Sequence, residues 1–208
     1  MNTNLSPEPA AFFKLNIWIA RALEPGDAPV LYRWVNDPEL RPYFNRCLVE
    51  SLSEEIDWIN GLPKRKMHNQ VWMVEVDGVS IGTMGLHGIH WQNRTATTGA
   101  MFGNEAYLNQ GYGEQVKMLL LKHAFDQLNL RQIYSEVISF NDRSRAYSEK
   151  CGYQKIATIP DDIHYNGRFY DKLIMRVRRE DWLPYWENFC ALHKIESLEE
   201  MLERHKKK

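Results

Sequence analysis

Two glycines at the start of an amphipathic segment are the first feature of this sequence that suggests chemistry. Gly111 and Gly113 follow Gln110, and the apolar residues after them recur at helical spacing as far as Leu128. The first N–H groups of a helix lack intrahelical partners, and glycine lets a ligand come close to them. A phosphate group is the natural ligand for such N–H groups, although both glycines could instead only shape a turn.

Two well-known phosphate-binding motifs do not fit this segment. No Gly-Lys-Ser or Gly-Lys-Thr triplet follows the glycines, which excludes a Walker loop. Val116 stands where the third glycine of a dinucleotide-binding fingerprint would be. The segment therefore requires another explanation.

A second motif lies thirty residues after Gly111. Asn141 or Asp142 can cap a short helix there, and Gly152 can end it. Taken in order, Gln110-Gly111-Tyr112-Gly113 and Asn141-x-x-Ser144, followed by Cys151-Gly152-Tyr153, resemble the GNAT acetyltransferase superfamily. The segments 107–114 and 34–40 most resemble its RimJ/RimL-like branch. The resemblance extends over residues 15–178.

This resemblance implies an α+β fold and an enzymatic activity. The expected fold is a mixed, mostly antiparallel twisted sheet with flanking helices and a central parallel strand pair. The expected reaction moves an acetyl group from acetyl-CoA directly to a primary amine, either a protein N-terminus or a small amine. Two rivals stay open: a GNAT-fold module that binds CoA without turnover, and a structural protein whose Gly-x-Gly is accidental.

The resemblance also implies where the cofactor binds. Backbone groups before the glycine loop would contact pantetheine, backbone N–H groups of the loop would contact pyrophosphate, and Asn141 would contact the pantetheine arm or only cap its helix. The expected cofactor contacts are Met101, Phe102, Gly103, Gln110, Gly111, Tyr112, Gly113, Glu114, Asn141 and Ser144.

The catalytic groups are less well defined by the motifs. Many family members have a tyrosine seven residues after the motif asparagine, but this chain has Ser148 there and Tyr147 beside it. Ser144 and Tyr147 are the candidate proton donors, and His87, His90 and Glu105 are the candidate bases. The expected acceptor contacts are Trp34, Tyr43, Phe44, His87 and Tyr165, although aromatic residues at helical spacing can equally be core residues.

Composition and charge limit the other classes of function. The chain has 208 residues and a net charge of −1, which gives no case for a nucleic-acid or membrane partner. Three widely spaced cysteines form neither a metal-binding pattern nor a disulfide framework, and no apolar run approaches a membrane span. These features favour a metal-free, cytoplasmic protein that is a monomer or a homodimer.

Hydrophobic periodicity and turn residues predict the elements that would position these groups. The expected division is an N-terminal tail (1–14), the GNAT-like domain (15–178) and a C-terminal helical extension (179–208) that docks on the domain or on another subunit. Within the domain we expect strands at 15–21, 71–76, 79–86, 95–102 and 131–137, a hairpin over 154–177, and helices ending near 35, at 53–61, at 112–128 and at 141–152.

Overall fold

The computed structural model describes residues 11–15, 18–44 and 48–195. Eight strands form one sheet in the order β1-β2-β3-β4-β5-β6-β8-β7, and only β5 and β6 run parallel to each other. The strands are β1 Ala11–Leu15, β2 Trp18–Ala22, β3 Gln70–Val76, β4 Val79–His90, β5 Thr95–Phe102, β6 Gln132–Ile138, β7 Gln154–Tyr165 and β8 Arg168–Arg178. The expected mixed sheet with a central parallel pair is confirmed.

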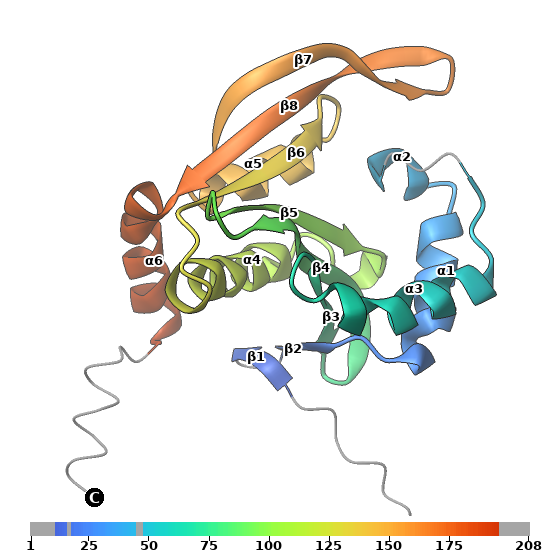
Figure 1. Cartoon of the computed structure of the whole chain (residues 1–208), viewed down its shortest axis with the longest axis horizontal. Helices are drawn as coiled ribbons and strands as arrows, with labels where there is room; N and C mark the ends of the chain where they lie inside the picture. Colours follow the sequence, from blue (N-terminus) through green and yellow to red (C-terminus); the bar gives the residue numbers. More distant parts are fainter. Residues whose placement is uncertain (1–10, 16–17, 45–47, 196–208) are drawn as a thin grey trace, which may run out of the picture.

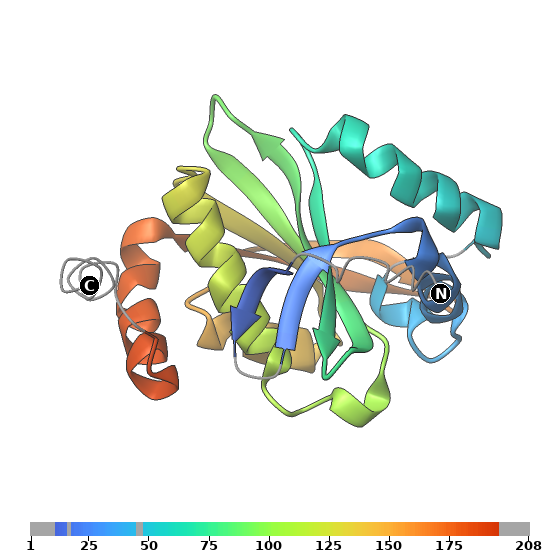
Figure 2. The ribbon, with the colours of Figure 1, turned by 90° about the horizontal axis from the view of Figure 1, so that it is seen from below.

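Helices cover both faces of this sheet (Figures 1 and 2). One face carries α1 Ala28–Asn36, α2 Arg41–Phe44 and α3 Leu52–Arg65, and the other carries α4 Tyr112–Lys122, α5 Asp142–Lys150 and α6 Arg179–His193. Side chains alternate accordingly in β4, where Met84 and Leu86 are buried in the core with α4, and Thr83, Gly85 and His87 face the α1–α3 side.

The parallel pair is joined over only half of its length. Residues 95–98 of β5 pair with residues 132–135 of β6, and the pairing then stops. Further along, β6 continues to pair with β8 as far as Ile138. The last residues of β5 and β6 therefore diverge, and a gap opens in the middle of the sheet.

Turn chemistry predicted the two long hairpins well. Asp77 and Gly78 join β3 to β4 with φ values of 48° and 77°, and Asn166 and Gly167 join β7 to β8 with φ values of 49° and 77°. These left-handed conformations are the ones that Asp-Gly and Asn-Gly pairs adopt most readily. The hairpin predictions are confirmed.

The prediction for α3 was wrong at both ends. The N-cap is Ser51 instead of Ser53, because Ser51 and Glu54 form a reciprocal capping box. The helix also continues past Gly61 and through Pro63 to Arg65. The Arg65 guanidinium donates hydrogen bonds to the carbonyls of Trp58 and Gly61 in the same helix.

The two ends of the domain also differ from expectation. Residues 11–14 were assigned to a tail, but they form most of β1, where the Phe12 ring stacks on Trp72 with centroids 5.3 Å apart. The C-terminal helix α6 ends at His193, and it packs on the π-helical turn after α4 through Trp182 and Phe125, whose rings are 5.2 Å apart. The predicted continuation of this helix to residue 204 lies outside the described residues.

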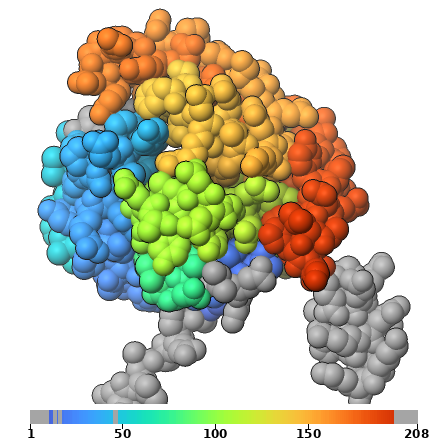
Figure 3. All heavy atoms as spheres, turned by 180° about the vertical axis from the view of Figure 1, so that it is seen from behind, coloured from blue at the N-terminus to red at the C-terminus, as the bar shows by residue number. Residues whose placement is uncertain are grey.

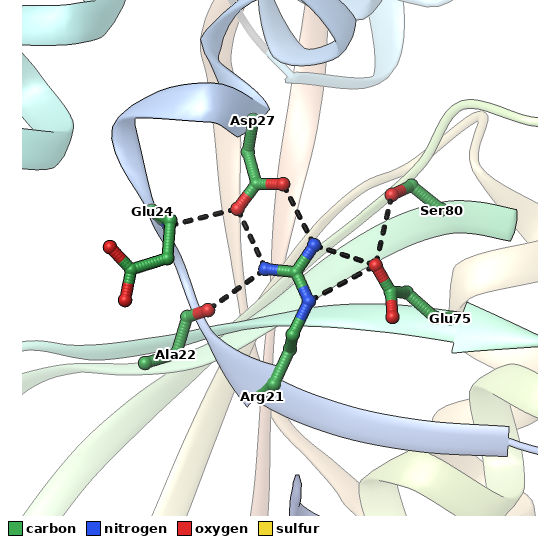
Figure 4. Close-up of polar contacts among 6 residues, drawn as sticks. All are labelled: Arg21, Ala22, Glu24, Asp27, Glu75 and Ser80. Atoms are coloured by element: carbon green, nitrogen blue, oxygen red, sulfur yellow. Dashed lines mark hydrogen bonds and ion pairs between the residues drawn. The ribbon is translucent and has the colours of Figure 1, made fainter. Parts of the chain in front are cut away.

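A buried ionic cluster fixes the start of α1 to the sheet (Figure 4). The Arg21 guanidinium of β2 donates hydrogen bonds of 2.8 Å to both carboxylate oxygens of Asp27 and of 2.6 and 3.0 Å to Glu75 Oε1 of β3. Asp27 also accepts a hydrogen bond from the backbone N–H of Glu24. The bond to Asp27 raises the pKa of Arg21 above its ordinary value, so this guanidinium stays charged.

Removal of the guanidinium should destabilise the protein strongly, because two buried carboxylates would lose their shared cation. We expect Arg21→Met to lower the free energy of unfolding by about 3–5 kcal/mol. The matched control is Arg145→Met, which removes an exposed ion pair with Asp142 and should cost at most about 1 kcal/mol. Urea denaturation of both variants measures the difference, and equal losses would contradict a supporting role for this cluster.

Candidate active site

A cavity of about 970 Å³ occupies the gap between the diverging ends of β5 and β6. The space-filling view shows the molecule hollowed where α2 (blue), the loop before α4 (light green) and α5 (gold) meet (Figure 3). Twelve of the expected site residues line this cavity: Tyr43, Phe44, His87, Met101, Phe102, Gly111, Tyr112, Gly113, Glu114, Asn141, Ser144 and Tyr147.

One end of the cavity presents the N-terminus of α4. Gly111 is the N-cap with φ 83°, a conformation that glycine adopts without steric cost, and it offers no side chain to the helix. The Gln115 N–H group donates to the Gly111 carbonyl at 3.1 Å and forms the first bond of the helix. The N–H groups of Tyr112, Gly113 and Glu114 precede this bond, and with the helix dipole they favour an anion.

Asn141 begins the second motif helix, α5. Its side-chain oxygen accepts a hydrogen bond of 3.0 Å from the Ser144 N–H group, so the capping interpretation is correct. Asn141 and Ser144 also line the cavity. Capping holds the carboxamide in a fixed position at the cavity wall, and the two roles are compatible.

Ser148, at the position where many family members have a tyrosine, contacts a buried lysine instead. Ser148 is fully buried, and its hydroxyl accepts a hydrogen bond of 3.0 Å from Lys117 Nζ of α4. The same ammonium lies 4.1 Å from the centroid of the Tyr147 ring and 4.9 Å from that of Tyr153. Sequence reasoning missed Lys117, although a lysine inside the apolar run of residues 116–121 was a visible signal.

His87 lies in a hollow made by two glycines. Gly85 and Gly99 are paired across β4 and β5, and a Cβ atom on them would lie 3.2 and 2.9 Å from His87 Nε2. The imidazole therefore covers bare backbone at the cavity wall. Burial lowers the pKa of His87 below its ordinary value of 6.5, so the ring is neutral at neutral pH.

Helices α2 and α3 form the opposite wall. Tyr43, Phe44 and Trp58 line it together with Glu55, a carboxylate that is only 5% exposed and that the sequence analysis did not single out. Tyr43 also contacts Phe140 of the β6–α5 loop, with ring centroids 5.9 Å apart. This contact joins the α1–α3 side to the far wall of the cavity.

Six expected site residues lie outside the cavity lining. One is the candidate base His90, which is exposed at the end of β4 and accepts a hydrogen bond from the Asn93 N–H group. The Gly103 N–H group donates to the Ile81 carbonyl at 3.1 Å, so it is not available to a thioester, and Trp34 packs directly over Gly103 in the core. The Gln110 side chain donates to the Ala106 carbonyl, Glu105 is exposed in a short turn, and Tyr165 ends β7 at the hairpin turn. Packing and strand register, which the motifs do not specify, separate these residues from the site.

Two further searches cover the described residues. In that part of the chain, no group of three or more His, Cys, Asp or Glu side chains is placed to hold a metal ion. None of the helices found there is long and apolar enough to cross a membrane.

The lowered pKa of His87 predicts a pH effect on stability. The folded protein holds this proton less tightly than the unfolded chain, so the contribution from His87 falls as the pH drops below 6.5. We expect His87→Gln to lose less unfolding free energy than the parent protein between about pH 7 and about pH 5. Denaturant titrations at both pH values measure this. Burial also lowers the pKa of His123, but His123 is present in both proteins, so its effect cancels in the comparison. An identical loss of unfolding free energy in the two proteins would contradict the burial of His87.

Comparison with known proteins agrees with this geometry. A family model described as an acetyltransferase (GNAT) domain matches residues 18–154. The chain is 25% identical over 163 residues to the uncharacterized N-acetyltransferase YoaA of Bacillus subtilis (strain 168), covering 76% of this chain and 92% of that protein. Among solved structures, it is similar to spermidine N-acetyltransferase from Vibrio cholerae in complex with CoA and spermine, with a TM-score of 0.74, 23% identity and coverage of 80% and 98%.

A second structure has a similar fold. It is RimL, a ribosomal L7/L12 alpha-N-protein acetyltransferase in complex with coenzyme A, with a TM-score of 0.71, 17% identity and coverage of 81% of this chain and 98% of that chain. The family model extends over well more than half of the chain and includes both motifs of the cavity. The chain therefore belongs to the GNAT acetyltransferase family, and acetyl-CoA is its cosubstrate.

Proposed function

We propose that this protein is an N-acetyltransferase of the RimJ/RimL-like branch that moves an acetyl group directly to a primary amine, a protein N-terminus or a small amine. The observation that carries the proposal is the course of the cavity, which runs from the α4 N-terminus through the β5–β6 gap to the α2–α3 wall. Phosphates suit the first end, pantetheine suits the gap, and an acceptor amine suits the wall. Ser144, in the small-residue position of the RimJ/RimL pattern, and the similarity to RimL support the branch.

Pantetheine would bind in the gap as an additional strand. Met101 and Phe102 line the cavity beyond Thr98, the last residue of β5 that pairs with β6. Backbone groups left without a strand partner can pair with the amides of a ligand, as they do in strand addition. The thioester would then lie between the two strands, near His87 on one side and α5 on the other.

Two side chains at this point have suitable chemistry for transfer. In our proposal the neutral His87 accepts a proton from the attacking amine, and the Tyr147 hydroxyl donates a proton to the departing thiolate. A bond forms between the amine nitrogen and the acetyl carbon, and the bond from that carbon to sulfur breaks. Lys117 beneath the Tyr147 ring holds the ring in place and adds positive charge near the thiolate.

Direct transfer is favoured over an acyl-enzyme on Cys151. Burial raises the pKa of this thiol to about 12, so it is protonated and unreactive at neutral pH. Its sulfur lies against the Glu114 carbonyl, behind the phosphate-binding helix turn.

The rival proposal is a GNAT-fold module that binds CoA without turnover. Its support is Ser148, which stands where many family members have a tyrosine and whose hydroxyl accepts a hydrogen bond from Lys117. Steady release of CoA from acetyl-CoA in the presence of an amine panel would exclude this rival. Binding of acetyl-CoA with no release above the rate in buffer would favour it.

A charge placed at the helix start should abolish cofactor binding. At a concentration one hundred times its dissociation constant, acetyl-CoA should add about 2.7 kcal/mol to the unfolding free energy of the parent protein. This corresponds to a rise of about 5–10 °C in melting temperature. Gly111→Glu should lose this shift, because the carboxylate occupies the phosphate position. Gly26→Glu, at a site where a Cβ atom meets nothing within 4 Å, should keep it. Gly111→Ala separates backbone strain from charge, and a normal shift in Gly111→Glu would refute the cofactor site.

The proton donor can be tested by removing single hydroxyls. Tyr147→Phe keeps the ring over Lys117 and should lower kcat by about 100-fold or more with little change in the KM for acetyl-CoA. Ser144→Ala should cost at most about tenfold, equivalent to one neutral hydrogen bond. Glu105→Gln, in the exposed turn outside the cavity, is the control and should leave kcat unchanged. If Ser144→Ala is the more damaging change, the donor is Ser144.

A further inference from the structure

A second, smaller cavity of about 380 Å³ lies at the far end of strands β6 and β8. Three arginines line it, Arg131, Arg176 and Arg178, together with Gln132 and Glu180. The chain as a whole carries a net charge of only −1, so this concentration of guanidinium groups is a local feature. Neither the cavity nor its arginines take part in the acetyl-CoA site described above.

The arginines differ in how far their charge is already balanced. Arg178 forms ion pairs with Asp181 at 2.7 Å and with Glu180 at 3.5 Å. Within the described part of the chain, Arg131 and Arg176 form no such pair. Glu180 is the one carboxylate in the lining, so the cavity keeps an excess of positive charge that an anionic ligand would balance.

Strand register connects this cavity to the acetyl-CoA site. Thr97 of β5 is the partner of His87 on β4 and of Tyr134 on β6, and Tyr134 in turn is the partner of Arg176 on β8. Paired residues project from the same face of a sheet, so these four side chains form one row across four neighbouring strands. Three strand spacings place the Arg176 backbone about 14 Å from that of His87.

The face that carries this row is the side of α1–α3, where α3 packs against β3. In the next row towards the acetyl-CoA site, Lys172 is shared by two carboxylates, Asp162 at 2.6 Å and Glu136 at 3.6 Å. The row from His87 to Arg176 itself consists of His87, Thr97, Tyr134 and Arg176 and contains no carboxylate. An extended chain lying along this row would bring its own charges to the arginines.

We propose that this arginine cavity binds acidic side chains of a peptide acceptor whose terminal amine lies at His87. The inference rests on the proposed function and selects the protein N-terminus over the small amine. At about 3.3 Å per residue, an extended peptide brings its fourth to sixth residues to Arg176 and Arg131. A polyamine would be repelled by the same guanidinium groups.

Two matched peptides test the inference with the full-length protein. Both have the same free N-terminal residue and length, one with glutamate at residues four to six and the other with glutamine, and spermidine is the small-amine comparison. We expect the glutamate peptide to have a kcat/KM at least about tenfold higher, with a preference that weakens as salt increases. Peptide dissociation constants with bound CoA are measured alongside the rates.

Arginine variants test which residues cause the preference for the glutamate peptide. Arg176→Gln and Arg131→Gln should reduce the ratio of the two kcat/KM values towards one and leave the rate with the glutamine peptide unchanged. Lys155→Glu is the control, because Lys155 of β7 pairs with the buried Met175 of β8 and so lies on the opposite face of the sheet from Arg176. It should keep the full preference. The unchanged rate with the glutamine peptide also shows that each variant is folded.

The outcomes separate the two proposals. Transfer to both peptides at equal rates, or a preference that survives both arginine substitutions, overturns the acidic-peptide site alone. Preferred binding of the glutamate peptide with no transfer to any amine overturns the proposed function and keeps the site. A faster rate with spermidine than with either peptide overturns the choice of a protein acceptor.

Discussion

The divergence of β5 and β6 is the constraint on which the rest of this structure depends. Strand β6 has neighbours on both sides, but it pairs with β5 only up to Ser135 and with β8 up to Ile138. Backbone polar groups in a sheet interior seldom stay without partners. The open edges therefore carry backbone groups that can pair with a ligand, and the α4 N-terminus and His87 both line the cavity at this opening.

Buried polar contacts hold the two helical layers around the opening. On one face, Arg21 joins β2, β3 and the start of α1, which leads to the cavity wall at α2 and α3. On the other face, Lys117 joins α4 to α5 through Ser148 and the two aromatic rings, and so relates the phosphate end to the Asn141 end. Such contacts add less net stability than their geometry suggests, because each charge must first be desolvated. Their effect is positional: they set where each layer stands relative to the gap.

The same sheet supports two regions of different charge. The cavity at the diverging strand ends is built from aromatic groups, glycine and helix N-termini, which suit a thioester and its phosphates. The far ends of β6 and β8 carry arginines, and a single row of side chains crosses the sheet between them. A sheet face is well suited to such an arrangement, since register fixes the distance between its rows without any flexible element.

The sequence alone determined most of the elements and the glycine loop before α4. Local signals were sufficient for the hairpins at Asp77-Gly78 and Asn166-Gly167, for β5, and for the helix start at Gly111, because turn type and helix capping depend on neighbouring residues. Local signals failed where a distant residue decided the outcome. Strand β1 exists by pairing with β2, with Phe12 stacked on the distant Trp72, and α3 continues through Pro63 to Arg65.

Only the tertiary structure decided which candidates share the site. Trp34 and Gly103 fit the motif, but they pack against each other in the core, and Glu105 lies exposed outside the cavity. Lys117 lies within an apolar run and Glu55 lies on a helix face, and neither residue belongs to a motif that indicated chemistry. A motif indicates which residue types can act on a shared ligand. How deeply a side chain is buried and where it points depend on how the helices pack on the sheet, and the residues that decide this packing are spread over the whole chain.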